Sequence, residues 1–279
     1  MMLHILATTD GLEHAREAVR FASQLAVQAG ARMTVLGVAE AADRDGVARR
    51  AIGDARRLLD ERGINYTTKL RHGHPAEQIL QEIEQCSYDL VVIGARGRSR
   101  LTRFLLGSVS YRVLEHATIP VLVVRQACPQ VKRILVATGG HPESAAAMRY
   151  GARLARALGA AQTLLHVTNP VPRMYTGLGE MDETLREMMQ SATPEGQSLR
   201  EGARIMGDEE VEGYIELRQG VVEDEIIHEA AQGDYDLIVL GSSLSASTIG
   251  WLALGSITRR VIDRTQRPVL VVPGSKPKG

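Results

Sequence analysis

A glycine- and serine-rich segment from Gly94 to Ser110 has the residue types of an anion-binding loop. It reads GARGRSRLTRFLLGSVS, with the spacing Gly-x2-Gly-x9-Gly-Ser, and it follows the apolar run DLVVI. Gly94 and Gly97 carry no side chain where backbone amides could approach phosphate oxygens. Gly107 and Ser108 open a helical pattern, whose free N–H groups and dipole favour an anion, and serine hydroxyls add donors. Three glycines at this spacing therefore predict a phosphate site, although one isolated glycine would predict only a turn.

Positive charge gathers in the same segment, which contains Arg96, Arg98, Arg100 and Arg103. Arginine pairs readily with phosphate, and we expect Arg96 to contribute to the site. Arg100 and Arg103 are better explained as a solvated face, because exposed arginines usually serve solubility alone.

Other catalytic and nucleotide-binding signatures are missing. No Gly-Lys-Ser/Thr follows the glycines, and GARGRS is not the GxGxxG of dinucleotide-binding folds, so kinase and dehydrogenase functions are not predicted. His72 and His74 have no third ligand at recognisable spacing, so we expect surface residues and no protein metal site. No Ser-His-Asp or Cys-His arrangement can be proposed, and no catalytic residue is predicted.

Short β-branched runs alternate with amphipathic helical patterns around this segment. In the first half of the chain, strands are expected over residues Leu3–Thr8, Met33–Val38, Ile64–Leu70, Leu90–Ile93 and Val121–Val124. Runs such as DLVVIG and PVLVV are apolar on both faces, as parallel strands between two helical layers must be. With right-handed crossovers, this rhythm predicts an α/β fold with a doubly wound, five-stranded, mostly parallel sheet.

The whole pattern occurs twice. LHILATTDG, which begins at Leu3, returns as KRILVATGG, and GHPAEQILQEIEQCSYDLVVIGARG returns as GVVEDEIIHEAAQGDYDLIVLGSSL. We therefore expect two tandem domains, over residues 1–126 and 131–273. The junction at Gln126–Val131 is too short for a free linker. The two copies should pack as a pseudo-dimer, with Val121–Val124 antiparallel to Val269–Val272, which would cover two sheet edges.

These motifs resemble the universal stress protein family, in its tandem form, over essentially the full chain. The resemblance implies a Rossmann-like fold of the adenine nucleotide α-hydrolase type, with ATP bound by the first domain. It also implies Mg²⁺ with the ATP, since a triphosphate needs its charge neutralised. The family places adenine and ribose at the end of the first strand and the phosphates at the glycine loop, at the topological switch point of the sheet.

Carried onto this sequence, the resemblance gives a set of candidate residues. Asp10 would hydrogen-bond the nucleoside, and the backbone near Val38 would edge the adenine. Asp10 could instead be only a helix N-cap. The full predicted ATP-binding set is Thr9, Asp10, Gly11, Val38, Gly94, Arg96, Gly97, Gly107, Ser108, Val109 and Ser110.

The second copy departs from the family's pattern. Gly139 stands where the first copy has Asp10, Leu244 stands where it has Gly97, and the loop contains no arginine. We expect this copy to bind nucleotide weakly. Trp251 in that loop is expected either to pack, or to fill the vacated pocket or form an interface. An insertion over Asn169–Gln197 is expected to form a loop with a short helix from about residue 181 to 190, either as a surface excursion or as a lid or partner-docking segment.

Composition limits the function classes. Lys+Arg and Asp+Glu both number 33, so there is no basic excess for nucleic acid or membrane surfaces. Cys86 and Cys128 form no CxxC pair, no apolar run could span a bilayer, and no signal peptide is recognisable. We expect a cytoplasmic stress-response protein that binds ATP and hydrolyses it slowly at most. A homodimer is possible. The alternative is a nucleotide-independent interaction scaffold; a hydrolase of the related α-hydrolase group lacks a matching catalytic motif.

Overall fold

The computed structural model describes residues 3–40, 46–95, 106–141, 144–168, 185–242 and 255–274. The first half contains β1 (His4–Thr9), α1 (Glu13–Ala29), β2 (Arg32–Ala39), α2 (Gly46–Asp60), β3 (Tyr66–His72), α3 (Pro75–Gln85), β4 (Leu90–Gly94), α4 (Ser108–His116) and β5 (Val121–Val124). The second half contains β6 (Arg133–Thr138), α5 (Ser144–Leu158), β7 (Ala161–Thr168), α6 (Leu185–Gln190), α7 (Pro194–Asp208), β8 (Gly213–Gln219), α8 (Val222–Gln232), β9 (Leu237–Gly241), α9 (Ser256–Arg264) and β10 (Val269–Val272).

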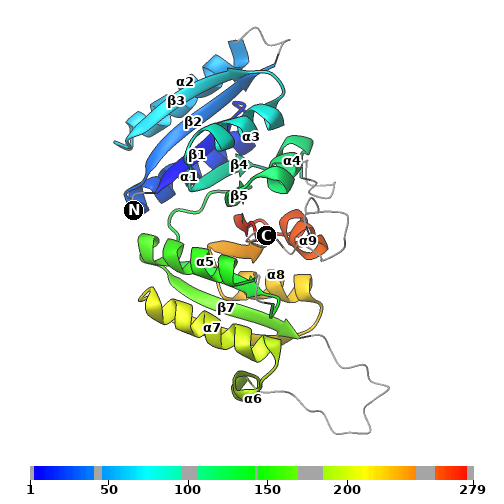
Figure 1. Cartoon of the computed structure of the whole chain (residues 1–279). Coiled ribbons are helices and arrows are strands. Elements are labelled where there is room, and N and C mark those ends of the chain that lie inside the picture. Colours follow the sequence, from blue (N-terminus) through cyan, green and yellow to red (C-terminus); the bar gives the residue numbers. More distant parts are fainter. Residues whose placement is uncertain are drawn as a thin grey trace.

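The described strands form one sheet in the order β3-β2-β1-β4-β5-β10-β9-β6-β7-β8. Within each half all strand pairs are parallel, as predicted for a doubly wound α/β fold. The halves join where β5 and β10 pair antiparallel, with Leu122 opposite Leu270 and Val123 opposite Val269. This is the pairing predicted from the two PVLVV runs. In Figure 1 the two halves lie one above the other, with β5 at the centre.

Helices cover both faces of this sheet and bury two cores that run through both halves. On one face, Ile5 and Ala7 of β1 pack in a core with residues of α1, α2, α5 and α7. On the other face, Leu6 packs in a core with residues of α3, α4, α8 and α9. Alternate residues of a strand point to opposite faces, so a strand buried on both sides must be apolar throughout. None of the helices in the described part of the chain is long and apolar enough to span a membrane.

Further contacts tie the halves together beside the strand pair. The Gln28 side-chain amide on α1 donates to the carbonyl oxygens of Val131 and Leu158, at 2.7 and 2.6 Å. The Tyr150 hydroxyl on α5 donates to the carbonyl oxygen of Asp89 at 2.9 Å. The two halves thus share a sheet, both cores and several hydrogen bonds.

The predicted insertion is described only from residue 185 onward. Its helix, α6, begins at Leu185 and packs on α7, with Met188 buried. The Arg200 side chain on α7 donates to the carbonyl oxygen of Ser191 at 2.8 Å. In Figure 1, α6 lies at the outer end of the second half, away from the first half. Within the described part, this segment is a surface excursion that does not approach the first domain.

Candidate functional site

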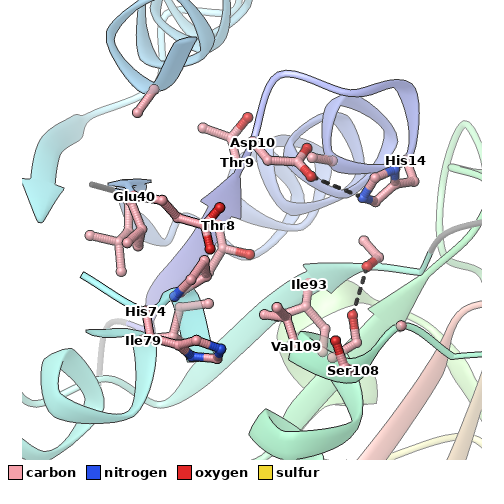
Figure 2. Close-up of a pocket in the computed structure, with 18 of the residues that line it drawn as sticks. Thr8, Thr9, Asp10, His14, Glu40, His74, Ile79, Ile93, Ser108 and Val109 are labelled. Atoms are coloured by element: carbon pink, nitrogen blue, oxygen red, sulfur yellow. Dashed lines mark hydrogen bonds and ion pairs between the residues drawn. The ribbon is translucent and has the colours of Figure 1, made fainter. Parts of the chain in front are cut away.

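A cavity of about 620 Å³ opens at the carboxyl ends of the strands of the first half. β1 pairs with β2 on one side and with β4 on the other, so the end of β1 is the topological switch point, where open α/β sheets bind ligands. A volume of this size suits a small organic molecule. The lining residues are Thr8, Thr9, Asp10, His14, Ala15, Leu36, Val38, Glu40, Val47, Ala48, His74, Pro75, Ile79, Ile93, Gly94, Gly107, Ser108, Val109 and Ser110 (Figure 2).

One wall of the cavity is apolar. Leu36 and Val38 come from β2, and Ile79 comes from α3, on the same face of the sheet. His74, at the N-cap of α3, is exposed at this wall, beside Ile79 in Figure 2. Such a wall can take the face of a flat apolar or aromatic group.

Asp10, directly after β1, supplies a carboxylate that contacts the beginning of α1. Asp10 Oδ1 accepts a hydrogen bond from the Leu12 amide at 2.9 Å, just before α1 begins. Its Oδ2 lies 3.4 Å from His14 Nε2, and Figure 2 shows the two side chains facing each other. Asp10 therefore supports the start of α1 without being its N-cap, which is Leu12, two residues later. Its side chain is 45% exposed and still lines the cavity, so the two roles are compatible.

Thr9 and Gly11 contribute mainly to the turn after β1. Thr9 is buried and its hydroxyl accepts from the Gly11 amide at 3.2 Å. Gly11 has φ +79°, and a Cβ on it would lie 3.1 Å from the Ala51 side chain. Unlike the other predicted residues in the described part, Gly11 does not line the cavity. It is required for the backbone conformation of the turn and for close packing against α2.

The opposite wall is the N-terminus of α4. Gly107 is the N-cap, and the first backbone bond into this helix runs from the Tyr111 amide to the Gly107 carbonyl. The amides of Ser108, Val109 and Ser110 thus precede the helical hydrogen-bond pattern, as in any first turn. Ser108 is exposed, and a Cβ on Gly107 would meet nothing within 4 Å. This wall offers N–H groups and a helix dipole to an anion.

The structure shows a packing requirement at Gly94, while its predicted approach to phosphate stays a prediction. Its hypothetical Cβ would lie 2.4 Å from the His14 carbonyl oxygen and 2.9 Å from the Ala15 amide nitrogen, so glycine is needed where α1 crosses β4. Ser110 is also engaged, because its hydroxyl donates to the Gly94 carbonyl at 3.1 Å. Both residues line the cavity, but their evident contacts are structural.

Arg96 and Gly97 lie outside the described residues, as do Leu244 and Trp251 of the second copy. The remaining predicted residues except Gly11 come together around one cavity. Sequence reasoning missed several lining residues, chiefly His14, Glu40, Val47, His74 and Ile79. Only Glu40 carried a usable signal, because it follows the second strand, at the same sheet edge as Asp10. Within the described part, no three His, Cys, Asp or Glu residues form a metal-binding cluster.

Comparison with known proteins identifies the repeated unit. The universal stress protein family model matches residues 1–125 and again residues 130–273. The chain belongs to the universal stress protein family. It carries two universal stress domains in tandem, as its internal repeat predicted.

Relatives with the family name match over different extents. A universal stress protein of Mycolicibacterium smegmatis is 29% identical over 237 residues, which cover 81% of this chain and 76% of the relative. One from Methanocaldococcus jannaschii is 29% identical over 138 residues, or 44% of this chain and 81% of the relative. Universal stress protein YxiE of Bacillus subtilis is 39% identical over 72 residues, 26% of this chain and 49% of the relative.

Solved structures show the same fold over nearly the full chain. A universal stress protein from Archaeoglobus fulgidus superposes with a TM-score of 0.74 at 22% identity, covering 97% of this chain and 98% of that chain. A functionally unknown protein from Pseudomonas aeruginosa gives a TM-score of 0.70 at 18% identity, covering 98% and 93%. At these identities the likeness establishes the fold of the tandem universal stress protein and nothing further.

The second universal stress domain fills the corresponding strand end with side chains. His166 of β7 pairs with Thr138 of β6. The equivalent pair in the first domain is Gly37 of β2 with Thr9 of β1, so a histidine replaces a glycine at this position. The His166 ring is buried and hydrogen-bonds the Thr138 carbonyl at 3.0 Å. A Cβ on Gly140 would lie 2.9 Å from the Glu195 side chain and 3.3 Å from His166. The second domain therefore differs from the first in two ways at this strand end: side chains crowd it, and Gly139 lacks the carboxylate of Asp10.

The second universal stress domain nevertheless keeps the brace seen at Ser110. Thr258 Oγ1 donates to the Gly241 carbonyl at 3.5 Å, as Ser110 does to Gly94. Because both domains have this contact, the Ser110 hydroxyl supports the position of α4. The predicted part of Ser110 in ligand binding stays a prediction.

Proposed function

We propose that the first universal stress domain binds ATP in the cavity between β1, β2, β4 and α4. One observation carries this proposal: a single cavity joins the apolar wall at Val38 to the open N-terminus of α4 at Gly107 and Ser108. The apolar wall suits an adenine ring, and the first-turn amides suit phosphate oxygens. Asp10, directly after β1, lines the same cavity and can accept hydrogen bonds from ribose hydroxyls.

The protein is proposed to act as a nucleotide-dependent regulatory or stress-response factor in the cytoplasm. The cavity's carboxylates, Asp10 and Glu40, follow β1 and β2, whereas Ser108 and Val109 lie at the α4 wall (Figure 2). No carboxylate among the described lining residues comes from α4, and we propose no general base among them. Slow hydrolysis at most is therefore expected.

Mg²⁺ would accompany the triphosphate. The described residues contain no cluster of three metal-ligating side chains, so the ion would be held mainly by phosphate oxygens and water. We assign no step to the metal. Arg96 and Gly97 of the glycine loop stay predictions, since they lie outside the described residues.

Calorimetry of the purified chain with Mg-ATP tests the proposal, with about one site per chain expected. Gly107→Val should abolish that site, because its φ of −64° accepts a branched residue and its side chain would cover the α4 amides. The matched control is Gly255→Val, at the N-cap of α9 in the second domain, where ATP binding should be unchanged.

A parallel titration with adenosine separates the two halves of the site. If α4 holds phosphates, adenosine should bind more weakly than ATP and should be insensitive to Gly107→Val. Two equal ATP sites would contradict the assignment to the first domain. No ATP binding by the folded wild-type chain would favour the nucleotide-independent scaffold, for which protein partners are also still to be found.

A further inference from the structure

The second domain reaches the proposed site of the first domain through helix α9. Tyr111 and Arg259 are the fourth residues of α4 and α9, and they occupy equivalent positions in the two repeats. The Arg259 guanidinium carbon lies 5.3 Å from the centre of the Tyr111 ring. This is within the range of a cation–π contact. The two helices thus meet through equivalent positions, close to the β5–β10 pair.

A second contact between these helices reaches the residue next to the α4 N-cap. The Leu106 amide donates a hydrogen bond to Asp263 Oδ1 at 3.3 Å. Leu106 immediately precedes Gly107, whose neighbours supply the proposed phosphate-binding amides. Asp263 Oδ2 lies 3.8 Å from Arg259 Nε, and the Asp263 side chain is 21% exposed. A partly buried carboxylate of the second domain therefore binds the backbone amide that immediately precedes the N-cap of α4 in the first domain.

The equivalent acid of the first domain has a partner inside its own helix. Asp263 is the eighth residue of α9, and the eighth residue of α4 is Glu115. Glu115 accepts a hydrogen bond from the Tyr111 hydroxyl, which raises the pKa of Tyr111. Among the described contacts, Asp263 is therefore the acid of this pair that reaches across to the other domain.

We propose that Asp263 is a positioning residue through which the second domain sets the nucleotide affinity of the first. The proposal rests on the proposed ATP function of the first domain. By holding the Leu106 amide, Asp263 fixes the backbone that leads into Gly107 and Ser108. A helix N-terminus that is already ordered binds an anion better, because binding does not have to order it. The second domain would thus support nucleotide binding although its own strand end is filled.

Direct electrostatics predict the opposite sign. A carboxylate close to a phosphate site repels the phosphate, so removing the charge alone should tighten binding. Positioning predicts weaker binding when the acceptor is lost and little change when it is kept. Asp263→Ala removes the acceptor. Asp263→Asn keeps an amide oxygen that can still accept from Leu106.

The experiment measures Mg-ATP affinity and amide hydrogen exchange in the full chain. Asp263→Ala should weaken ATP binding by about tenfold, the effect of losing one charge-assisted hydrogen bond. It should also speed exchange at Leu106 in the ligand-free protein. Asp263→Asn should keep the ATP affinity and the exchange rate at Leu106 within about twofold of the wild-type values. Asp224→Ala removes an exposed carboxylate of α8 that pairs with Arg264 inside the second domain, and it should change neither. If Asp263→Ala fails to fold, Asp263→Ser, which is too short to reach Leu106, should give the same weakening.

The outcomes separate this proposal from the function on which it rests. If the wild-type chain binds ATP and Asp263→Ala binds it equally or more tightly, the positioning role is wrong and the ATP function stands. If the wild-type chain does not bind ATP, the proposed function fails, and Asp263 has no nucleotide affinity to set. Unchanged exchange at Leu106 in Asp263→Ala overturns the positioning role whatever ATP does.

Discussion

Gly94 lies directly against the backbone of His14, so that a Cβ on Gly94 would come within 2.4 Å of the His14 carbonyl oxygen. Backbone cannot yield as a flexible side chain can, and Gly94→Ala should push α1 away from β4. We expect the free energy of unfolding to fall by about 1–3 kcal/mol, the usual effect of overpacking. Urea unfolding followed by circular dichroism measures it. Gly107→Ala is the control, since its Cβ would meet nothing within 4 Å, and it should stay close to wild type. Equal losses in the two variants would contradict the packing explanation.

Asp10 is expected to have two separable roles. Asp10→Ala removes the acceptor for the Leu12 amide, which should lower the free energy of unfolding by about 1 kcal/mol. Asp10→Asn keeps one acceptor oxygen and should retain most of that stability. Both variants lose the carboxylate. If that carboxylate accepts a hydrogen bond from a ribose hydroxyl, both should weaken ATP binding by about 10-fold or more. Calorimetry and urea unfolding of the same samples provide both measurements. Wild-type ATP affinity in Asp10→Asn would show that the carboxylate serves only the helix.

An ion-pair cluster around the buried carboxylate of Glu82 makes stability depend on pH. Burial alone would raise the pKa of Glu82, but hydrogen bonds from Lys69, Tyr88 and Arg71 lower it to about 2 from an ordinary 4.5. The carboxylate is 1% exposed, with Lys69 Nζ at 2.6 Å and Arg71 Nε at 2.7 Å. Because the folded-state pKa lies below the unfolded one, the contribution to stability is complete above about pH 4.5 and is lost as pH falls toward 2.

Glu82→Gln should therefore lower stability at pH 7 and flatten its decline in acid. Leaving two cations beside a neutral amide in a buried position should reduce the free energy of unfolding by about 3 kcal/mol. Urea unfolding at pH 7, 4.5 and 3 measures both effects. Glu61→Gln, at an exposed position, should follow the wild-type curve. A Glu82→Gln curve parallel to wild type between pH 4.5 and 3 would refute the role of Glu82 in the acid decline.

The fold could be predicted from sequence because its signals are local and occur twice. Apolar runs such as DLVVIG and DLIVLG identify central strands, and predicted strand bounds fall within one or two residues of those observed. The two PVLVV runs also indicated the joining strands. The insertion could not be treated in this way, because nothing repeated in the chain shows where α6 packs.

The site was predicted less completely because its walls come from distant elements. His74 and Ile79 reach the cavity only through the crossover that brings α3 beside β2, and neither has a local signature. Gly94 fitted a phosphate-loop pattern, yet its evident requirement is contact with α1, which is remote in sequence. The missing carboxylate at Gly139 could be predicted by aligning the two repeats. The crowding of the second strand end by His166 and Glu195 could not, because it depends on how β7 and α7 pack.

Gln28 should hold the two domains in a fixed arrangement beyond what the β5–β10 pair provides. Its side-chain nitrogen donates to the Val131 and Leu158 carbonyls, and its oxygen accepts from the Val131 amide at 3.3 Å. Gln28→Ala leaves three backbone groups of the second domain without this partner. We expect the free energy of unfolding to fall by about 1–3 kcal/mol and the Val131 amide to exchange faster. Val27→Ala is the control on the next residue, because Val27 is 60% exposed, and it should change neither quantity. If Gln28→Ala matches Val27→Ala in both measurements, then water replaces these hydrogen bonds without loss, and the shared sheet and cores alone hold the domains together.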